Sequence, residues 1–144
     1  MLNNDSIKLL KECDAGTKMA VSAIDDVRDK VSDKELMDLL MESKKHHEKL
    51  GNDLHSLLEQ NNSSEKEPNP IAKSMSWFKT NMKLSMNDSD NTVADLITQG
   101  CDMGVKSLHK YLNQYSNAEQ PATSICRDLI DIEEELRDGL KKYL

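Results

Sequence analysis

The sequence predicts an all-α four-helix bundle, and three observations lead to this prediction. Aromatic residues make up only 3% of the 144 residues, so aliphatic side chains and eight methionines must fill the core, as is typical of helical packing. Apolar residues recur at three- and four-residue steps in four long segments. The motif Cys-Asp-x-Gly-x-Lys begins at Cys13 and again at Cys101, 88 positions later (101 minus 13). We infer that one helical hairpin occurs twice within a single domain, residues 1–144.

The first hairpin is bounded by capping residues and has two apolar stripes. Asn4 or Asp5 can cap the first helix, and Ser32 with Glu35 forms a capping box for the second. The short link makes the two helices antiparallel. The expected inward positions are Ile7, Leu10, Cys13, Thr17, Ala20, Val21, Ile24 and Val27, then Leu36, Leu40, Ser43, His47, Leu50, Leu54 and Leu57. The four helices of the bundle are expected over residues 4–31, 33–59, 91–117 and 121–143.

A long connection, residues 60–90, separates the two hairpins. Its first part is polar and carries two of the three prolines, which is typical of a solvated loop. A short amphipathic helix is expected over residues 71–86, with Trp77 beside its apolar side, and it either covers the core or docks a partner. A connection of about 30 residues can run the length of the bundle and make the second and third helices parallel.

The second hairpin repeats the pattern of the first. Residues 87–92 supply Asp and Ser caps for the third helix, and Pro121 suits the first turn of the fourth. Gly16 and Gly104 stand at matching places in mid-helix, and we expect them to allow close approach of neighbouring helices. The expected inward positions are Val93, Ile97, Cys101, Gly104, Leu108, Leu112 and Tyr115, then Ile125, Leu129, Ile132, Leu136, Leu140 and Tyr143.

Charge and cysteine content exclude several classes of function. The net charge of -7 and the pI near 5.1 argue against binding to nucleic acid or to an anionic membrane, because both require a basic surface. No apolar run reaches membrane-spanning length, and the N-terminus lacks the pattern of a signal peptide, so a cytoplasmic protein is expected. The three cysteines form no Cys-x-x-Cys pattern, which argues against structural disulfides and a zinc knuckle.

Three stretches resemble the ferritin-like superfamily, and more closely an uncharacterised bacterial family of four-helix-bundle proteins within it. They are residues 9–16, residues 71–79 and residues 96–104. The resemblance implies a ferritin-like antiparallel bundle in which the long crossover joins the second and third helices. It also implies a possible di-iron centre, built from a Glu on each of two helices and Glu-x-x-His on each of the other two.

The chain departs from this di-iron pattern in every helix. In the second helix, His47 lies on the inward stripe, but the residue three before it is Lys44 instead of a carboxylate. The fourth helix has three consecutive glutamates and no histidine, and the first and third helices carry Cys13 and Cys101 at the inward positions. An intact di-iron site is therefore not expected.

Several interpretations of the inward polar residues remain open. The first is a buried polar layer in which Lys44 pairs with Glu133 or Asp14 and His47 is a satisfied core histidine. The second is a copper or zinc site with Cys13, Cys101 and His47 as ligands. The third is a reversible disulfide between Cys13 and Cys101, although helix axes that lie about 8–10 Å apart make that bond difficult.

A fourth interpretation is a degenerate iron site formed by Glu42, His46 and Glu133 or Glu134. The function expected first is that of a non-enzymatic structural or interaction protein without a cofactor, which could form a homodimer. The alternative is a protein that binds a transition metal, copper, zinc or iron, inside the bundle. No phosphate loop or nucleophile motif stands at a recognisable spacing.

Overall fold

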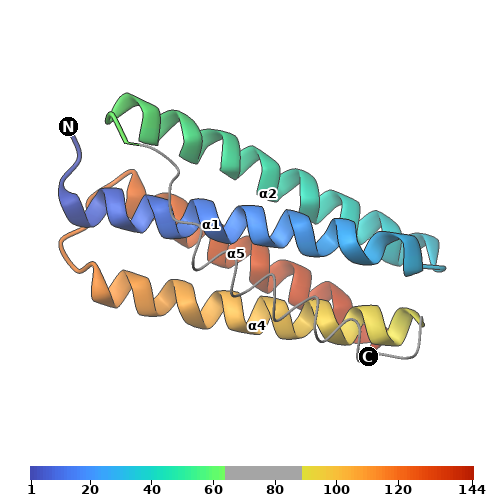
Figure 1. Cartoon of the computed structure of the whole chain (residues 1–144). Coiled ribbons are helices and arrows are strands. Elements are labelled where there is room, and N and C mark those ends of the chain that lie inside the picture. Colours follow the sequence, from blue (N-terminus) through green and yellow to red (C-terminus); the bar gives the residue numbers. More distant parts are fainter. Residues whose placement is uncertain (64–88) are drawn as a thin grey trace.

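The computed structural model describes residues 1–63 and 89–144, and these residues form helices, turns and short loops without a β-strand (Figure 1). The prediction of an all-α fold is confirmed for this part of the chain. The long helices are α1 (Asn4–Val27), α2 (Lys34–Gln60), α4 (Asp90–Gln114) and α5 (Ala122–Leu140). Short 3-10 turns extend two of them, after α1 (Arg28–Lys30) and after α5 (Lys141–Tyr143). The expected helix over 71–86 lies outside the described residues.

The helices begin at caps that differ from the expected ones by one residue. Asn3 caps α1 in place of Asn4 or Asp5, because its side chain accepts a hydrogen bond from the backbone of the first turn. Asp33 caps α2 in place of Ser32, whose backbone N–H instead donates to the Asp90 carboxylate at 2.8 Å. The α2 helix therefore begins one residue later than predicted. Ser89 caps α4, within the segment expected to supply a cap.

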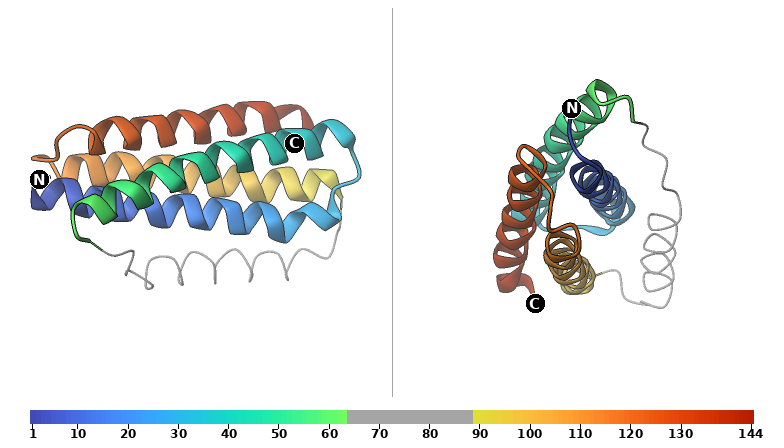
Figure 2. Two further views of the ribbon diagram at one scale, coloured as in Figure 1. Left: turned by 90° about the horizontal axis from the view of Figure 1, so that it is seen from above. Right: turned by 90° about the vertical axis from the view of Figure 1, so that its left-hand side faces the viewer.

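Hydrogen bonds at the two ends of the bundle fix the direction of each helix. At one end, Leu2 N–H donates to Asn61, and the Asn3 side chain donates to the Asn117 carbonyl, so the start of α1 lies beside the ends of α2 and α4. At the other end, Asp90 accepts from the backbone of the α1–α2 link, and Asn91 donates to the Tyr143 carbonyl. Thus α1 and α5 run in one direction and α2 and α4 in the other (Figures 1 and 2).

Helices α1 and α5 each pack against the other three described helices, whereas α2 and α4 lie on opposite sides of this pair (Figure 2). The α1 helix packs against α2, α4 and α5, and α5 also packs against α2 and α4. The end view in Figure 2 shows α2 and α4 at opposite corners of the bundle. Within residues 1–63 and 89–144, no helix combines the length and the apolar character that a bilayer span requires.

The core consists of two apolar clusters, one toward each end of the bundle. The first cluster includes Leu10, Leu54 and Leu129, and the second includes Ile24, Leu40 and Leu136. Along every helix, the residues of one cluster stop before those of the other begin. The interval between the clusters is where polar side chains are buried, and it holds the candidate site.

The Asp90 carboxylate ties the start of α4 to the α1–α2 link, because it accepts from both Ser32 N–H and Asp33 N–H. We predict that Asp90→Ala lowers the free energy of unfolding by about 1–2 kcal/mol, since two backbone donors lose their partner. Urea denaturation checks this value. Asp95→Ala is the matched control, because Asp95 is exposed on the same helix and bonds the nearby Gln99 side chain. Equal losses for the two variants would contradict the role given to Asp90.

Candidate functional site

A buried polar layer crosses the bundle between the two apolar clusters. Each helix interrupts its apolar stripe at this level, with Thr17 in α1, His47 in α2, Gly104 in α4 and Glu133 in α5. Thr17, His47 and Glu133 are 2%, 0% and 7% exposed. Because a polar group without water needs a partner inside the protein, the contacts within this layer decide what it can do.

His47 and Glu133 form the centre of the layer, and their hydrogen bonds determine where the protons lie. His47 Nδ1 lies 2.8 Å from the Ser43 carbonyl oxygen, which can only accept, so Nδ1 carries a proton. His47 Nε2 lies 2.9 Å from Glu133 Oε1, and one more proton must lie between these two atoms. Both ring nitrogens are therefore engaged in hydrogen bonds.

The protonation of His47 follows from two opposing effects. Burial by itself lowers the pKa of His47, whereas the hydrogen bond and the negative charge of Glu133 raise it, and the net effect is a raised pKa. The imidazolium form is therefore favoured, and it faces the carboxylate as a buried ion pair between α2 and α5.

Cys101 in α4 is the third chemical group of the layer. Burial raises the pKa of the Cys101 thiol far above its usual range, and the charge and hydrogen bond of Glu133 raise it further. The thiol therefore stays protonated and donates to the carboxylate. Nucleophilic attack and soft-metal binding both require the thiolate, so either role of Cys101 would first have to remove this proton.

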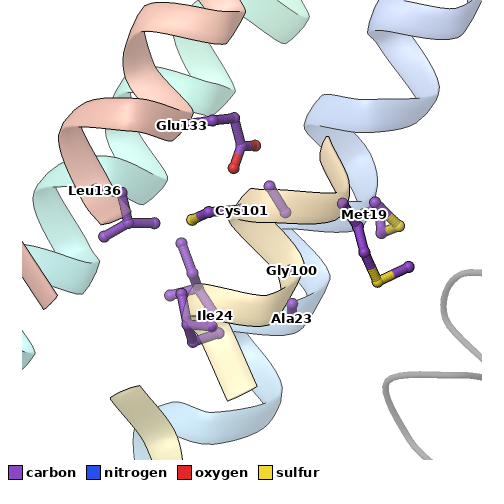
Figure 3. Close-up of a pocket in the computed structure, with 10 residues that line it drawn as sticks. Met19, Ala23, Ile24, Gly100, Cys101, Glu133 and Leu136 are labelled. Atoms are coloured by element: carbon purple, nitrogen blue, oxygen red, sulfur yellow. The ribbon is translucent and has the colours of Figure 1, made fainter. Parts of the chain in front are cut away.

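Two hollows lie between α1 and α4 and reach the layer from outside. The first has a volume of about 50 Å³, and Cys101 and Glu133 extend into it from α4 and α5, with Met19 on the α1 side (Figure 3). The second, of about 80 Å³, also reaches Glu133 and Met19. A Cβ atom on Gly104 would lie 3.5 Å from the Glu133 carboxyl carbon, so Gly104 borders this carboxylate.

The predicted copper or zinc ligands are not brought together. Cys101 and His47 both lie next to Glu133, but Cys13 belongs to the first apolar cluster, where its partner is Cys126. Among the residues that the structure describes, no three His, Cys, Asp or Glu side chains form a group that could hold a metal ion. The alternative of a reversible disulfide between Cys13 and Cys101 is not supported either, because Cys101 belongs to the second apolar cluster.

The residues of the degenerate iron interpretation are also separated. Glu42 and His46 line a small hollow between α2 and α5, together with Glu135. Glu133 points to the opposite side, into the buried layer. Glu134 is only partly buried. These side chains therefore do not converge on one point.

The expected pairing of Lys44 with Glu133 or Asp14 is wrong. Lys44 Nζ lies 2.7 Å from Asp25 Oδ1, and Asp14 pairs with Lys18 at 3.0 Å, one turn along α1. Lys44 lies three residues before His47, which places it beside the inward stripe of α2, where its long side chain reaches the partly exposed Asp25 of α1. His47 is a satisfied core histidine as expected, but its partner is Glu133.

The expected inward positions of the fourth helix do not include the partner of Cys13. This partner is Cys126, which lies next to the inward residue Ile125 and is fully buried. The Cys13 thiol hydrogen-bonds Cys126, and this contact raises the pKa of Cys13 and lowers the pKa of Cys126. The available signal was spacing, because Cys126 precedes Leu129 by three residues and so lies on the same helix face.

The ion pair predicts a specific pH dependence of stability. Because the folded pKa of His47 is raised, the contribution of the pair is fully present below the unfolded pKa of about 6.5 and is lost as the pH rises through the folded pKa. We predict that Glu133→Gln costs about 1–2 kcal/mol below pH about 6.5 and progressively less above it.

Urea denaturation over this pH range measures the difference between the wild-type protein and the variant. The control is Glu135→Gln, which makes the same charge change at an exposed position of α5. A constant difference between wild type and Glu133→Gln at all pH values would contradict the charged pair.

Comparison with known proteins gives no additional indication of function. No protein-family model, curated protein or solved structure matches this chain. Function must therefore be inferred from the residues and contacts described above.

Proposed function

We propose that this chain is a non-enzymatic structural or interaction protein with a ferritin-like bundle that lacks an intact di-iron motif. The observation that carries the proposal is that both nitrogens of His47 already have partners in the polar layer. Nδ1 donates to the Ser43 carbonyl oxygen, and Nε2 is hydrogen-bonded to Glu133 Oε1. A metal at this level would have to displace the ion pair before it could bind either group.

The directions of the helices support the ferritin-like part of the proposal. The α2 helix ends at one end of the bundle and α4 begins at the other, so α2 and α4 run parallel. In the ferritin-like arrangement the second and third helices are likewise parallel and joined by one long crossover.

The chemistry of the layer supports a structural role over a catalytic one. The Cys101 thiol is held protonated, and His47 has no lone pair directed at a hollow. A general base needs such a lone pair, and a nucleophile needs the thiolate. The buried pair instead fixes the axial position of α2 against α5, because sliding either helix would leave a charge without a partner.

The proposed partners and location follow from surface charge. A net charge of -7 disfavours nucleic acid and anionic membrane surfaces, so a second copy of the chain or another protein is the favoured partner. We place the protein in the bacterial cytoplasm, and the homodimer stays a prediction.

Metal analysis tests the proposal directly. Protein purified without a histidine tag and reconstituted anaerobically with copper, zinc and iron should retain less than about 0.1 equivalent of each after dialysis. Mass spectrometry of the native protein measures the retained metal. One equivalent of a metal that is lost on Cys101→Ala or His47→Leu would overturn the proposal in favour of the metal-binding alternative.

A double-mutant cycle tests the structural role of the ion pair. His47→Leu should cost roughly 3–5 kcal/mol, because it leaves the Glu133 carboxylate buried without its partner. Combining it with Glu133→Met should recover most of that loss, since neither charge then remains. Urea denaturation measures each corner of the cycle. A double variant that is as unstable as the sum of the two single variants would contradict the coupling.

A further inference from the structure

The two cysteines that the polar layer does not use lie together in the first apolar cluster. Cys13 in α1 and Cys126 in α5 are each 0% exposed and belong to the same group of packed residues. The Cys13 thiol donates a hydrogen bond to the Cys126 sulfur, and Cys126 also lies 3.9 Å from the Leu108 carbonyl oxygen. No structural requirement of the bundle calls for two thiols at this place, since apolar side chains surround them.

Contacts on both sides of the pair fix the relative level of α1 and α5. The Glu119 N–H donates to Ser6 Oγ at 2.8 Å, an offset of 113 residues (119 minus 6). Further along, a Cβ built on Gly16 would lie 3.6 Å from Leu129 Cδ2, again an offset of 113 (129 minus 16).

The two cysteines share this offset and lie between the two contacts, since 126 minus 13 is also 113. Within the helices, α1 and α5 run in the same direction and rise by about 1.5 Å per residue, so Cys13 and Cys126, each one turn before Gly16 and Leu129, lie at the same level. Glu119 precedes α5 and places the start of that helix beside Ser6. The level of Cys13 and Cys126 is therefore determined independently of the hydrogen bond between them.

The usual spacing of two packed helices is compatible with a disulfide. A disulfide requires Cα atoms about 4.4–6.8 Å apart, and facing Cα atoms on helices whose axes lie about 8–10 Å apart are separated by about 3.4–5.4 Å, because each lies about 2.3 Å from its axis. One turn after Cys13, a Cβ on Gly16 would lie 3.6 Å from Leu129 Cδ2, which is an ordinary van der Waals contact. The two helices are therefore in contact next to the thiols, but Gly16 does not permit an approach that alanine would prevent.

We propose that Cys13 and Cys126 are a site of reversible oxidation, at which a small peroxide converts the two thiols into a disulfide that links α1 to α5. This site is separate from the polar layer and does not depend on the function proposed above. It replaces the expected pair of Cys13 and Cys101, which lie in different clusters.

The reaction balances with hydrogen peroxide as the oxidant. The Cys126 thiolate attacks one peroxide oxygen, the O–O bond breaks, and hydroxide leaves with the proton that Cys126 had released, giving water and a sulfenic acid. The Cys13 sulfur then attacks the Cys126 sulfur, the S–O bond breaks, and hydroxide leaves with the Cys13 proton as a second water. The two sulfurs lose two electrons in total, and the peroxide gains them.

The direction of this attack agrees with the hydrogen bond between the thiols. The Cys13 S–H stabilises negative charge on Cys126 and so lowers the pKa of Cys126, which makes it the attacking sulfur. The hollow of about 80 Å³ is lined by Gly16, Leu108 and Leu129, which neighbour the thiols. Neither cysteine lines it and both are fully buried, so oxidation requires a local opening of the packing around the pair.

The consequence of oxidation is a covalent link between two helices that belong to different hairpins. In the described part of the chain, the α1–α2 and α4–α5 hairpins otherwise associate through packing, hydrogen bonds and ion pairs, among them His47 with Glu133 and Glu35 with Lys142. The disulfide would restrict separation of the hairpins, so the redox state of the pair would control how readily the bundle opens.

Mass spectrometry of the whole chain tests this proposal. The folded wild-type protein is treated with hydrogen peroxide, then denatured and exposed to N-ethylmaleimide. We expect the loss of two hydrogen atoms, a single maleimide adduct on Cys101, and a peptide pair that joins Cys13 to Cys126. Dithiothreitol should restore all three maleimide-reactive thiols.

Two comparisons make the result specific. Cys101→Ala should form the same disulfide and carry no adduct after oxidation, whereas wild-type protein oxidised in denaturant should give mixed pairs that include Cys101. The decisive measurement uses wild-type protein, so it does not depend on whether Cys13→Ala or Cys126→Ala folds. Three adducts after peroxide treatment, a bond to Cys101 in the folded protein, or only disulfides between chains would each overturn the proposal.

Discussion

The hydrogen bond between His47 and Glu133 is the contact on which the arrangement of the bundle depends. It joins α2 to α5 at the level where the apolar stripes of all four described helices are interrupted. A buried charge tolerates almost no displacement from its partner, whereas apolar side chains can repack after a small shift. The pair therefore selects one axial position of the two helices, and the apolar clusters on either side fill the space that this position defines.

The same contact explains why the side chains of the layer are not available to react or to bind a metal. Glu133 uses one oxygen for His47 and also accepts from the Cys101 thiol, so three groups that could each react or bind a metal satisfy one another. Gly104 borders this carboxylate, and a Cβ there would make an ordinary van der Waals contact with it at 3.5 Å. The proposed oxidation site lies instead in the first apolar cluster, where Cys13 and Cys126 contact each other and Cys126 lies 3.9 Å from the Leu108 carbonyl oxygen.

The repeated motif has different surroundings in the two halves of the chain. Cys13 and Cys101 occupy equivalent sequence positions, yet Cys13 meets a thiol in α5 and Cys101 meets a carboxylate in α5. The glycines of the motif differ in the same way, since Gly16 packs on Leu129 and Gly104 packs on Glu133. The recurrence of the motif in the sequence therefore does not bring its two copies into one site.

The sequence by itself determined the helices and their buried faces, because both follow from local periodicity and capping. Most of the expected inward positions are buried, including His47, and the helix boundaries shifted by only a few residues. Leu58 instead of Leu57 completes the buried stripe of α2, a shift of one position that 3.6-residue periodicity does not resolve at a helix end.

Only the tertiary structure decided which buried groups meet. Lys44 reaches Asp25, Glu133 reaches His47 and Cys13 reaches Cys126, and each choice depends on the relative level and rotation of two helices. Sequence spacing fixes the position of a residue along its own helix but carries no information on how far a neighbouring helix has slid. That displacement is set by contacts between helices, which are the His47–Glu133 pair and the end contacts between Ser6 and Glu119 and between Asp90 and the α1–α2 link.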